Sequence, residues 1–228
     1  MAGVLYVVAT PIGNLADLSP RAAQILGQVG VVVAEDTRHS GVLLRGLGAR
    51  PRLISLPGEQ EERRIPGVLE QLAVQDVALV SDAGTPAISD PGRRLVAAAR
   101  AAGFQVVAVP GPSAAAAAVS ASGLRADRFL FLGFLPRTKS RMQRLLRAGD
   151  DWALVFHESP HRLAATLDWA SEVLGDRQMV VAREISKLHE SWYSGTAAEL
   201  AAHFKQEPPR GECTVVVEAP PGRTVAGG

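Results

Sequence analysis

Short apolar runs alternate with amphipathic segments along the first half of the chain. Five runs rich in β-branched and other apolar residues predict buried β-strands at residues 5–9, 31–34, 52–56, 77–80 and 105–109. The segments between them carry apolar residues at helical spacing and predict helices from residue 20 and over 42–47, 59–74 and 91–102. This alternation with short connections predicts an α/β fold with a mostly parallel, doubly wound sheet.

Two of these helices have a start signal in the sequence. Ser19-Pro20 and Asp90-Pro91 each pair an N-cap residue with a proline suited to the first helical position. Both helices are therefore expected to begin at their prolines, and Asp90 is interpreted as a helix cap rather than as a metal ligand.

The pattern changes after residue 112. Ser113 is expected to cap an alanine-rich helix over 114–121, and further helices are predicted over 139–147, 161–174 and 197–204. Strands are predicted over 129–133, 152–156, 179–183, 189–194 and 213–218. The third and fourth of these are joined by only a few residues, which allows a hairpin and predicts a mixed sheet. We therefore expect two α/β domains, 1–112 and 113–228, and a frayed tail from Pro220 onward.

Composition limits the class of protein. The chain has 228 residues, 47% hydrophobic and 21% charged, and a formal net charge of +1. Such a balance argues against wholesale non-specific binding to nucleic acid. One local basic stretch stands out, because residues 125–147 contain a single acid, Asp127, among Arg125, Arg128, Arg137, Lys139, Arg141, Arg144 and Arg147. This stretch is interpreted either as an RNA contact or as an ordinary solvated helix face.

Cysteine usage and the N-terminus indicate a cytoplasmic protein. Cys213 is the single cysteine, so no internal disulfide is possible, and its apolar neighbours predict a buried structural thiol. The first residues have no basic region followed by a long apolar stretch, and no segment approaches the length of a membrane span.

Three loops at the carboxyl ends of predicted strands contain glycine and small hydroxyl residues: 10–14, 81–92 and 109–113. Glycine allows a ligand to approach the backbone, and ligands of doubly wound sheets bind at these strand ends. We therefore predict a shared ligand pocket, although turns alone would also explain the glycines and prolines.

Several ligand classes are disfavoured by missing motifs. The chain has no Gly-x-x-x-x-Gly-Lys-Ser/Thr, no Gly-x-Gly-x-x-Gly after the first strand and no Gly-x-Ser-x-Gly. His157 and His161 have the spacing of zinc ligands, but Pro160 between them indicates a turn, so no metal site is predicted.

Six segments resemble the ribosomal small subunit methyltransferase I family, a branch of the tetrapyrrole methylase superfamily. They are Val8 to Leu15, Ala34 to Arg38, Ser81 to Gly92, Gly133 to Arg137, Glu158 to Arg162 and Arg183 to Lys187. The resemblance implies two α/β domains with S-adenosylmethionine in a cleft between them, and a homodimer. It also implies methylation of the ribose 2′-hydroxyl of a cytidine in 16S rRNA near the decoding centre, with the assembled small ribosomal subunit as partner.

The same resemblance implies a set of cofactor-binding residues: Pro11, Ala83, Gly84, Thr85, Ile88, Ser113, Ala114 and His157. Ala83 and Thr85 stand where tetrapyrrole methylases usually carry glycine and aspartate, which favours rRNA over a tetrapyrrole substrate. A precorrin or uroporphyrinogen C-methyltransferase and a non-catalytic binding module are the alternatives.

Methyl transfer to a ribose hydroxyl calls for a base or a cation near a weakly acidic group. Asp36 and Arg38, after the second predicted strand, and Lys187 with Glu184, after residue 183, are the candidates. Asp36 and Arg38 would equally suit an ion pair that fixes their loop, and Lys187 would equally suit a phosphate contact. The sequence does not assign the base.

Overall fold

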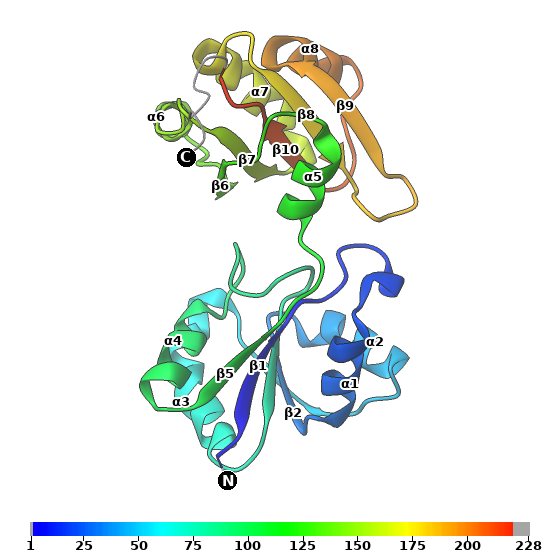
Figure 1. Cartoon of the computed structure of the whole chain (residues 1–228), viewed down its shortest axis with the longest axis vertical. Helices are drawn as coiled ribbons and strands as arrows, with labels where there is room; N and C mark the ends of the chain where they lie inside the picture. The colour runs from blue at the N-terminus through cyan, green and yellow to red at the C-terminus, as the bar shows by residue number, and fades with distance from the viewer. Residues whose placement is uncertain (1, 221–228) are drawn as a thin grey trace, which may run out of the picture. The chain divides into compact units, whose positions relative to one another are not determined.

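A computed structural model of the chain describes residues 2–220, and the chain folds as two compact units, Met1–Ser113 and Ala114–Gly228 (Figure 1). The tail predicted to fray lies, beyond Pro220, outside the described residues. Within the described part, no helix has the length and apolar character needed to cross a bilayer.

The first unit contains one parallel five-stranded sheet, as the apolar runs predicted. Its spatial order is β3-β2-β4-β1-β5. The strands are β1 (Val4–Val8), β2 (Val31–Ala34), β3 (Arg52–Ser55), β4 (Val77–Val80) and β5 (Gln105–Val109). Every residue of β2 and β4 is buried, because helices cover both faces of the sheet.

Helices cover both faces of this sheet (Figure 1). Helices α1 (Pro20–Gln28) and α2 (Thr37–Gly46) pack against one set of alternating strand residues, including Val32 and Ala34. Helices α3 (Glu61–Leu72) and α4 (Arg93–Ala101) pack against the opposite set, including Val31 and Val33. Alternation along a strand thus divides one apolar run between two cores. Short 3-10 turns, η1 (Leu15–Asp17) and η2 (Gly58–Gln60), complete the unit.

The two predicted helix starts have different outcomes. Ser19 caps α1 as expected, since its hydroxyl accepts from the Ala22 N–H at 3.1 Å. The start predicted at Asp90-Pro91 is wrong, because α4 begins at Arg93 with Gly92 at the N-cap. A buried carboxylate from α3 replaces the predicted cap: Glu61 Oε1 accepts from the N–H groups of Gly92, Arg94 and Leu95 at 3.1, 2.9 and 3.0 Å.

Helix α2 also begins earlier than its apolar residues indicated. It starts at Thr37 rather than at Val42, with Asp36 at the N-cap. The Asp36 carboxylate accepts from the Arg38 N–H at 2.8 Å, which satisfies one of the unpaired donors of the first turn.

The second unit contains a mixed five-stranded sheet, as predicted, in the order β6-β7-β10-β8-β9. Strands β6 and β7 are parallel, and the other neighbours, including the β8–β9 hairpin, are antiparallel. The strands are β6 (Phe129–Phe134), β7 (Ala153–Glu158), β8 (Gln178–Arg183), β9 (Ser191–Thr196) and β10 (Cys213–Val217). The helices are α5 (Ala114–Ser122), α6 (Lys139–Arg147), α7 (Pro160–Leu174) and α8 (Ala197–Gln206).

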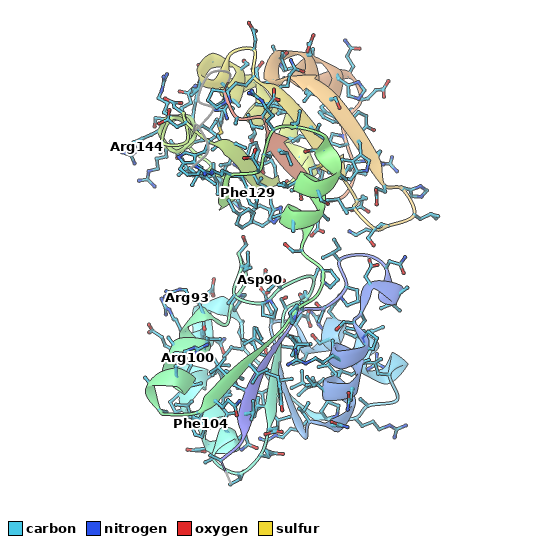
Figure 2. All side chains as sticks on the ribbon, in the orientation of Figure 1. Asp90, Arg93, Arg100, Phe104, Phe129 and Arg144 are labelled. Carbon is cyan, nitrogen blue, oxygen red and sulfur yellow. The ribbon has the colours of Figure 1, made fainter. Side chains whose placement is uncertain are left out.

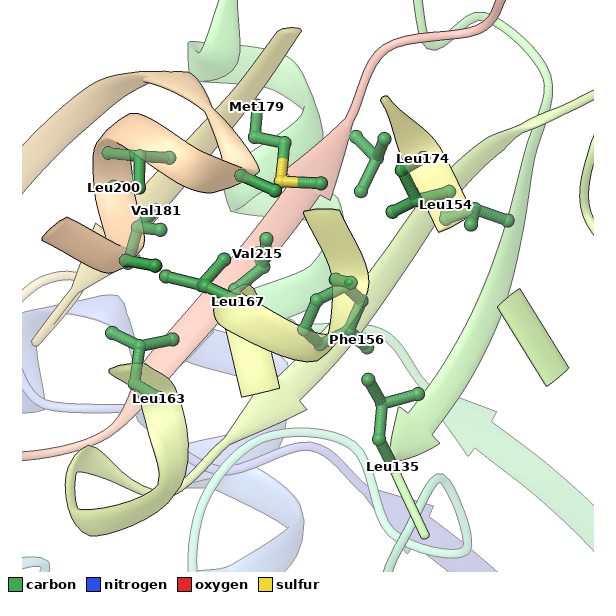
Figure 3. Close-up of a cluster of buried hydrophobic side chains, with 14 of the residues drawn as sticks. Leu135, Leu154, Phe156, Leu163, Leu167, Leu174, Met179, Val181, Leu200 and Val215 are labelled. Carbon is green, nitrogen blue, oxygen red and sulfur yellow. The ribbon is translucent and has the colours of Figure 1, made fainter. Parts of the chain in front are cut away.

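The larger core of the second unit lies between its sheet and helices α6, α7 and α8 (Figure 3). Phe156 and Val215 from the sheet meet Leu163 and Leu167 of α7 there. The alanine-rich helix α5 packs on the other sheet face, where the small side chains of Ala115 and Ala118 belong to the same apolar cluster as Val155 and Val216. Cys213 is buried, and burial raises the pKa of its thiol to about 12, in keeping with the predicted structural role.

Candidate functional site

The three predicted ligand loops follow strands that are neighbours in the first sheet. Strand β1 pairs with β4 on one side and with β5 on the other, all in parallel. Parallel neighbours end at the same edge, so the loops after β1, β4 and β5 begin side by side (Figure 1). This edge is the candidate site in the first unit.

Backbone hydrogen bonds join these loops directly. Thr10 and Gly84 form a β-bridge, in which the Thr10 N–H donates to Gly84 O at 2.9 Å and the Gly84 N–H donates to Thr10 O at 3.1 Å. The Thr85 hydroxyl donates to Pro112 O at 3.2 Å, which joins the second loop to the third. The loops therefore form one connected structure.

Two buried hydroxyls hold the turn at the end of β4. Thr10 and Ser81 are each only 2% exposed. The Thr10 hydroxyl donates to Ser81 O at 3.1 Å, and the Ser81 hydroxyl donates to Gly84 O at 3.1 Å. These hydroxyls give the loop carbonyls hydrogen-bond partners within the protein and so fix the shape of the turn.

Two glycines allow the loops to approach one another. Gly84 has φ +83°, and a Cβ there would lie 3.3 Å from Ile12 Cγ2 and 3.6 Å from Pro112 O. A Cβ on Gly111 would lie 3.0 Å from the Cβ of Ala9. A side chain at either position would press on the neighbouring loop, so both sites require the smallest residue.

The loop after β4 also carries backbone strain. Ala87 and Ser89 have φ values of 65° and 69°, in the left-handed region that non-glycine residues rarely adopt. Ile88, between them, is 47% exposed despite its apolar side chain. Residues held in such sparsely populated backbone conformations cluster at active sites and ligand-binding segments.

The structure places the residues expected to bind the cofactor in two groups. Pro11, Ala83, Gly84, Thr85 and Ile88 belong to the joined loops, whose third segment ends at Ser113. Ala114 begins α5, and His157 lies on β7 in the second unit.

Carboxylates gather beside this edge, at the ends of β2 and β4. The Asp36 N–H donates to Asp82 Oδ1 at 3.2 Å. Burial, with the nearby charges of Asp82 and Asp36, raises the pKa of Glu35. The sequence did not place Glu35 beside Asp82, because this grouping depends on β2 and β4 being neighbours in the sheet. This negative potential suits a cationic ligand.

Asp36 and Arg38 form the ion pair that the sequence offered as an alternative to catalysis. Arg38 Nη2 lies 2.7 Å from Asp36 Oδ2, and the Arg38 side chain is 90% exposed. The side-chain and backbone hydrogen bonds from Arg38 hold the pKa of Asp36 well below its usual range. An acid that is so readily ionised is a weak base at neutral pH.

His157 occupies an aromatic, partly buried position in the second unit. Its Nδ1 lies 3.0 Å from the Thr214 hydroxyl, and its ring packs against Phe131 and Phe134. Burial lowers the pKa of His157, although the charge of Glu212 opposes the shift. The imidazole is therefore held neutral at neutral pH.

Lys187 lies in the loop between β8 and β9, and two carboxylates contact its ammonium group. Its Nζ lies 2.9 Å from Glu184 Oε1 and 3.5 Å from Glu212 Oε2. Burial disfavours its charge, but the hydrogen bond to Glu184 and the charge of Glu212 outweigh burial and raise the pKa of Lys187. Lys187 is thus an oriented cation rather than a base.

The loop around Lys187 is itself strained and tightly bonded. Glu184 and Ser186 have φ values of 53° and 69°. The Glu184 carboxylate accepts from the Glu212 N–H at 3.0 Å, and Glu190 accepts from the Ser186 N–H at 2.6 Å. Glu212 acts on both His157 and Lys187, and sequence reasoning missed it because no motif marks the residue before a strand.

Helix α6 carries the second part of the basic stretch, whereas Arg137, expected to share a helical face with Arg141 and Arg144, precedes the helix. Arg141, Arg144 and Arg147 are exposed, whereas Met142 and Leu146 are fully buried; Figure 2 labels Arg144 on this helix. Within residues 2–220, no three histidine, cysteine, aspartate or glutamate side chains gather as metal ligands would.

Residues 4–201 match the family described as Tetrapyrrole (Corrin/Porphyrin) Methylases. The chain is 45% identical over 224 residues to Ribosomal RNA small subunit methyltransferase I of Synechocystis sp., covering 96% of this chain and 80% of the relative. It is 44% identical over 218 residues to the protein of the same name from Thermotoga maritima, covering 94% and 98%. Among solved structures, it is similar to uroporphyrin III C-methyl transferase from Thermus thermophilus, with a TM-score of 0.67, 20% identity, and coverage of 94% of this chain and 97% of that one.

Proposed function

The chain belongs to the ribosomal RNA small subunit methyltransferase I family of the tetrapyrrole methylases, and from this we propose that it methylates small-subunit rRNA with S-adenosylmethionine as donor. The observation that carries the proposal is the identity of 45% over 96% of the chain with a relative of that name. The target is the ribose 2′-hydroxyl of a cytidine in 16S rRNA near the decoding centre.

The joined loops of the first unit suit S-adenosylmethionine. Gly84 and Gly111 let the loops pack closely, Ile88 offers an exposed apolar surface, and the carboxylates around Asp82 favour a cation. Pro11, Ala83, Thr85, Ser113, Ala114 and His157 complete the proposed contacts. When bound, the cofactor supplies a methyl group activated by a sulfonium centre.

Lys187 is the residue we assign to the ribose oxygen. Its ammonium group is held by Glu184 and Glu212, so little reorganisation is needed for it to stabilise negative charge that develops on the hydroxyl. Asp36 and Arg38, already paired with each other, are better placed to hold the start of α2 than to move a proton. Alignment of the hydroxyl with the methyl group supplies much of the rate.

Recognition of the ribosomal particle is assigned in part to α6. The exposed guanidinium groups of Arg141, Arg144 and Arg147 suit bidentate contacts with phosphate. A net charge of only +1 favours an assembled subunit over free RNA as the substrate. We place the enzyme in the cytoplasm, where subunits assemble, and expect a homodimer, which light scattering in solution would detect.

Methyl transfer from labelled S-adenosylmethionine tests the proposal. Small subunits that lack the modification should accept label, and nuclease digestion should locate it on a cytidine ribose. A uroporphyrinogen or precorrin substrate serves as the control, because the tetrapyrrole alternative is supported only by structural neighbours such as the 20% identical one. Label in the tetrapyrrole but not in the subunit would reverse the assignment.

A further inference from the structure

The edge of the first unit formed by α2, the following turn and β3 is unusually basic. Residues 37–58 contain Arg38, Arg45, Arg50 and Arg52 and no acid. The whole chain has nearly balanced charge, with 24 basic and 23 acidic residues. We name this surface the α2–β3 edge, and it shares no residue with the joined loops or with α6.

The arginines of the α2–β3 edge face solvent. Arg38, Val42 and Arg45 are spaced by four and three residues, so they share one face of α2, and all three are exposed. Arg50 lies in the turn and Arg52 begins β3, which is an edge strand of the sheet. The basic groups therefore follow the helix away from the carboxyl-end edge, where α2 begins.

Three of these arginines have no counter-charge. Arg38 is paired with Asp36, but Arg45, Arg50 and Arg52 form no ion pair with any residue between 2 and 220. Exposed arginines elsewhere, such as Arg63 and Arg100, also form no ion pair with a described residue, so what distinguishes this edge is the gathering of four arginines without an acid. Clustered guanidinium groups repel one another, so binding of an anionic partner would reduce the electrostatic repulsion within this edge.

The arginines surround a hollow with an apolar floor. Arg45 and Arg50 line it together with Leu44, Leu53 and two glycines, Gly41 and Gly48. Gly41 keeps the floor open, because a Cβ there would lie 3.3 Å from Arg45 Nη1 and 3.6 Å from Leu53 Cδ1. The hollow thus offers apolar contact beside two guanidinium groups, whose planes can stack on a base and whose N–H groups can bind phosphate.

We propose that the α2–β3 edge binds the sugar–phosphate backbone of the rRNA substrate, with Arg45 and Arg50 on phosphates and a base or ribose in the hollow. This inference rests on the proposed function for the identity of the RNA. Charge selects RNA over a second copy of the chain, because a two-fold contact through this edge would place arginine against arginine.

A charge-reversal pair tests the proposal with a matched control. Arg45→Glu/Arg50→Glu changes the α2–β3 edge, and Arg63→Glu/Arg100→Glu makes the same charge change on α3 and α4, across the sheet; Figure 2 labels Arg100. The control is well matched, because Arg45 and Arg100 both lie in the last turn of a helix and both are exposed. Binding of small subunits and of a 16S rRNA fragment is measured as a function of salt, separately from methyl transfer.

We expect the Arg45→Glu/Arg50→Glu variant to bind RNA at least about 10-fold more weakly near 0.1 M salt, and the control to change less than about 2-fold. The slope of log affinity against log salt should fall by about 1 to 2 for two lost phosphate contacts. Affinity for S-adenosylmethionine should stay unchanged. The milder Arg45→Gln/Arg50→Gln variant should show a smaller loss in the same direction, and unfolding curves establish that each variant folds.

Two results would overturn the inference. The first is an equal loss of RNA affinity in the two charge-reversal variants. The second is an Arg45→Glu/Arg50→Glu variant that changes only in oligomeric state, which would make this edge a contact between copies. Failure of the proposed function looks different. In that case the wild type transfers no methyl group to small subunits, while its salt-dependent RNA binding still depends on Arg45 and Arg50.

Discussion

Thr10 and Gly84 exchange both of their backbone hydrogen bonds although they lie 74 positions apart. The bridge aligns the loop after β1 with the loop after β4, and the Thr85 hydroxyl extends the connection to Pro112. A ligand bound at this edge would therefore contact a preformed surface, which lowers the entropy lost on binding.

Replacing Gly84 with alanine should impair ligand binding at the joined loops more than it destabilises the protein. The residue would adopt φ +83° at a cost of about 1 kcal/mol, and its Cβ would press on Ile12. We expect S-adenosylmethionine affinity to fall at least about 10-fold, and Gly84→Val to abolish binding. Isothermal titration calorimetry checks both variants.

Gly103→Ala is the matched control for Gly84→Ala. Gly103 has nearly the same φ, +82°, but a Cβ there meets nothing within 4 Å. Both variants carry the cost of a positive φ, and only the Gly84 variant, whose Cβ also presses on Ile12, should lose affinity. Equal affinities in the two variants would remove Gly84 from the cofactor site.

Glu61 should be worth far more to stability than its neighbour Glu62. Its buried carboxylate satisfies three N–H groups at the start of α4, so Glu61→Ala leaves these donors unpaired and should cost about 2–4 kcal/mol. Glu61→Gln keeps an uncharged acceptor and should cost about half as much. Glu62→Ala, which removes an exposed pair with Arg94, should cost less than about 1 kcal/mol. Urea unfolding measures all three, and a Glu61→Ala loss no larger than that of Glu62→Ala would contradict the capping role.

The contact between Glu61 and the start of α4 shows why part of the fold could not be predicted from the sequence. The apolar runs predicted the strands of the first sheet, because burial on both faces leaves a direct trace in composition. The start of α4 was mispredicted because its cap, Glu61, comes from another helix, 31 positions before Gly92. Likewise, Glu35 and Asp82 become neighbours only through the order of β2 and β4. Most local signals predicted the right element, although the N-cap of α2 at Asp36 was missed. Contacts set by the order of the strands or by another helix left no such signal.

Lys187→Met should lower kcat for subunit methylation by at least about 100-fold while leaving S-adenosylmethionine affinity unchanged. The reason is the loss of the oriented cation proposed to stabilise the ribose oxygen. Lys187→Arg keeps the charge and should retain part of the activity. Lys205→Met is the control, because Lys205 pairs with Asp168 on the surface. A rise in KM with unchanged kcat would instead assign Lys187 to phosphate binding.

His157 should make the stability of the protein fall in mildly acidic solution. Burial lowers the pKa of His157 from its ordinary value of 6.5, despite the opposing charge of Glu212, so the unfolded chain binds this proton more tightly than the folded one. The free energy of unfolding should therefore decrease as the pH falls through 6.5 and below, with the effect fully absent above pH 7.5. In His157→Gln, which cannot titrate, the decrease between pH 7.5 and pH 5.5 should be smaller. Urea unfolding at the two pH values gives the comparison, with His161→Gln as the exposed control, since His161 lies in the first turn of α7 and is exposed. An equal pH dependence in wild type and His157→Gln would show that burial does not bias this imidazole toward its neutral form.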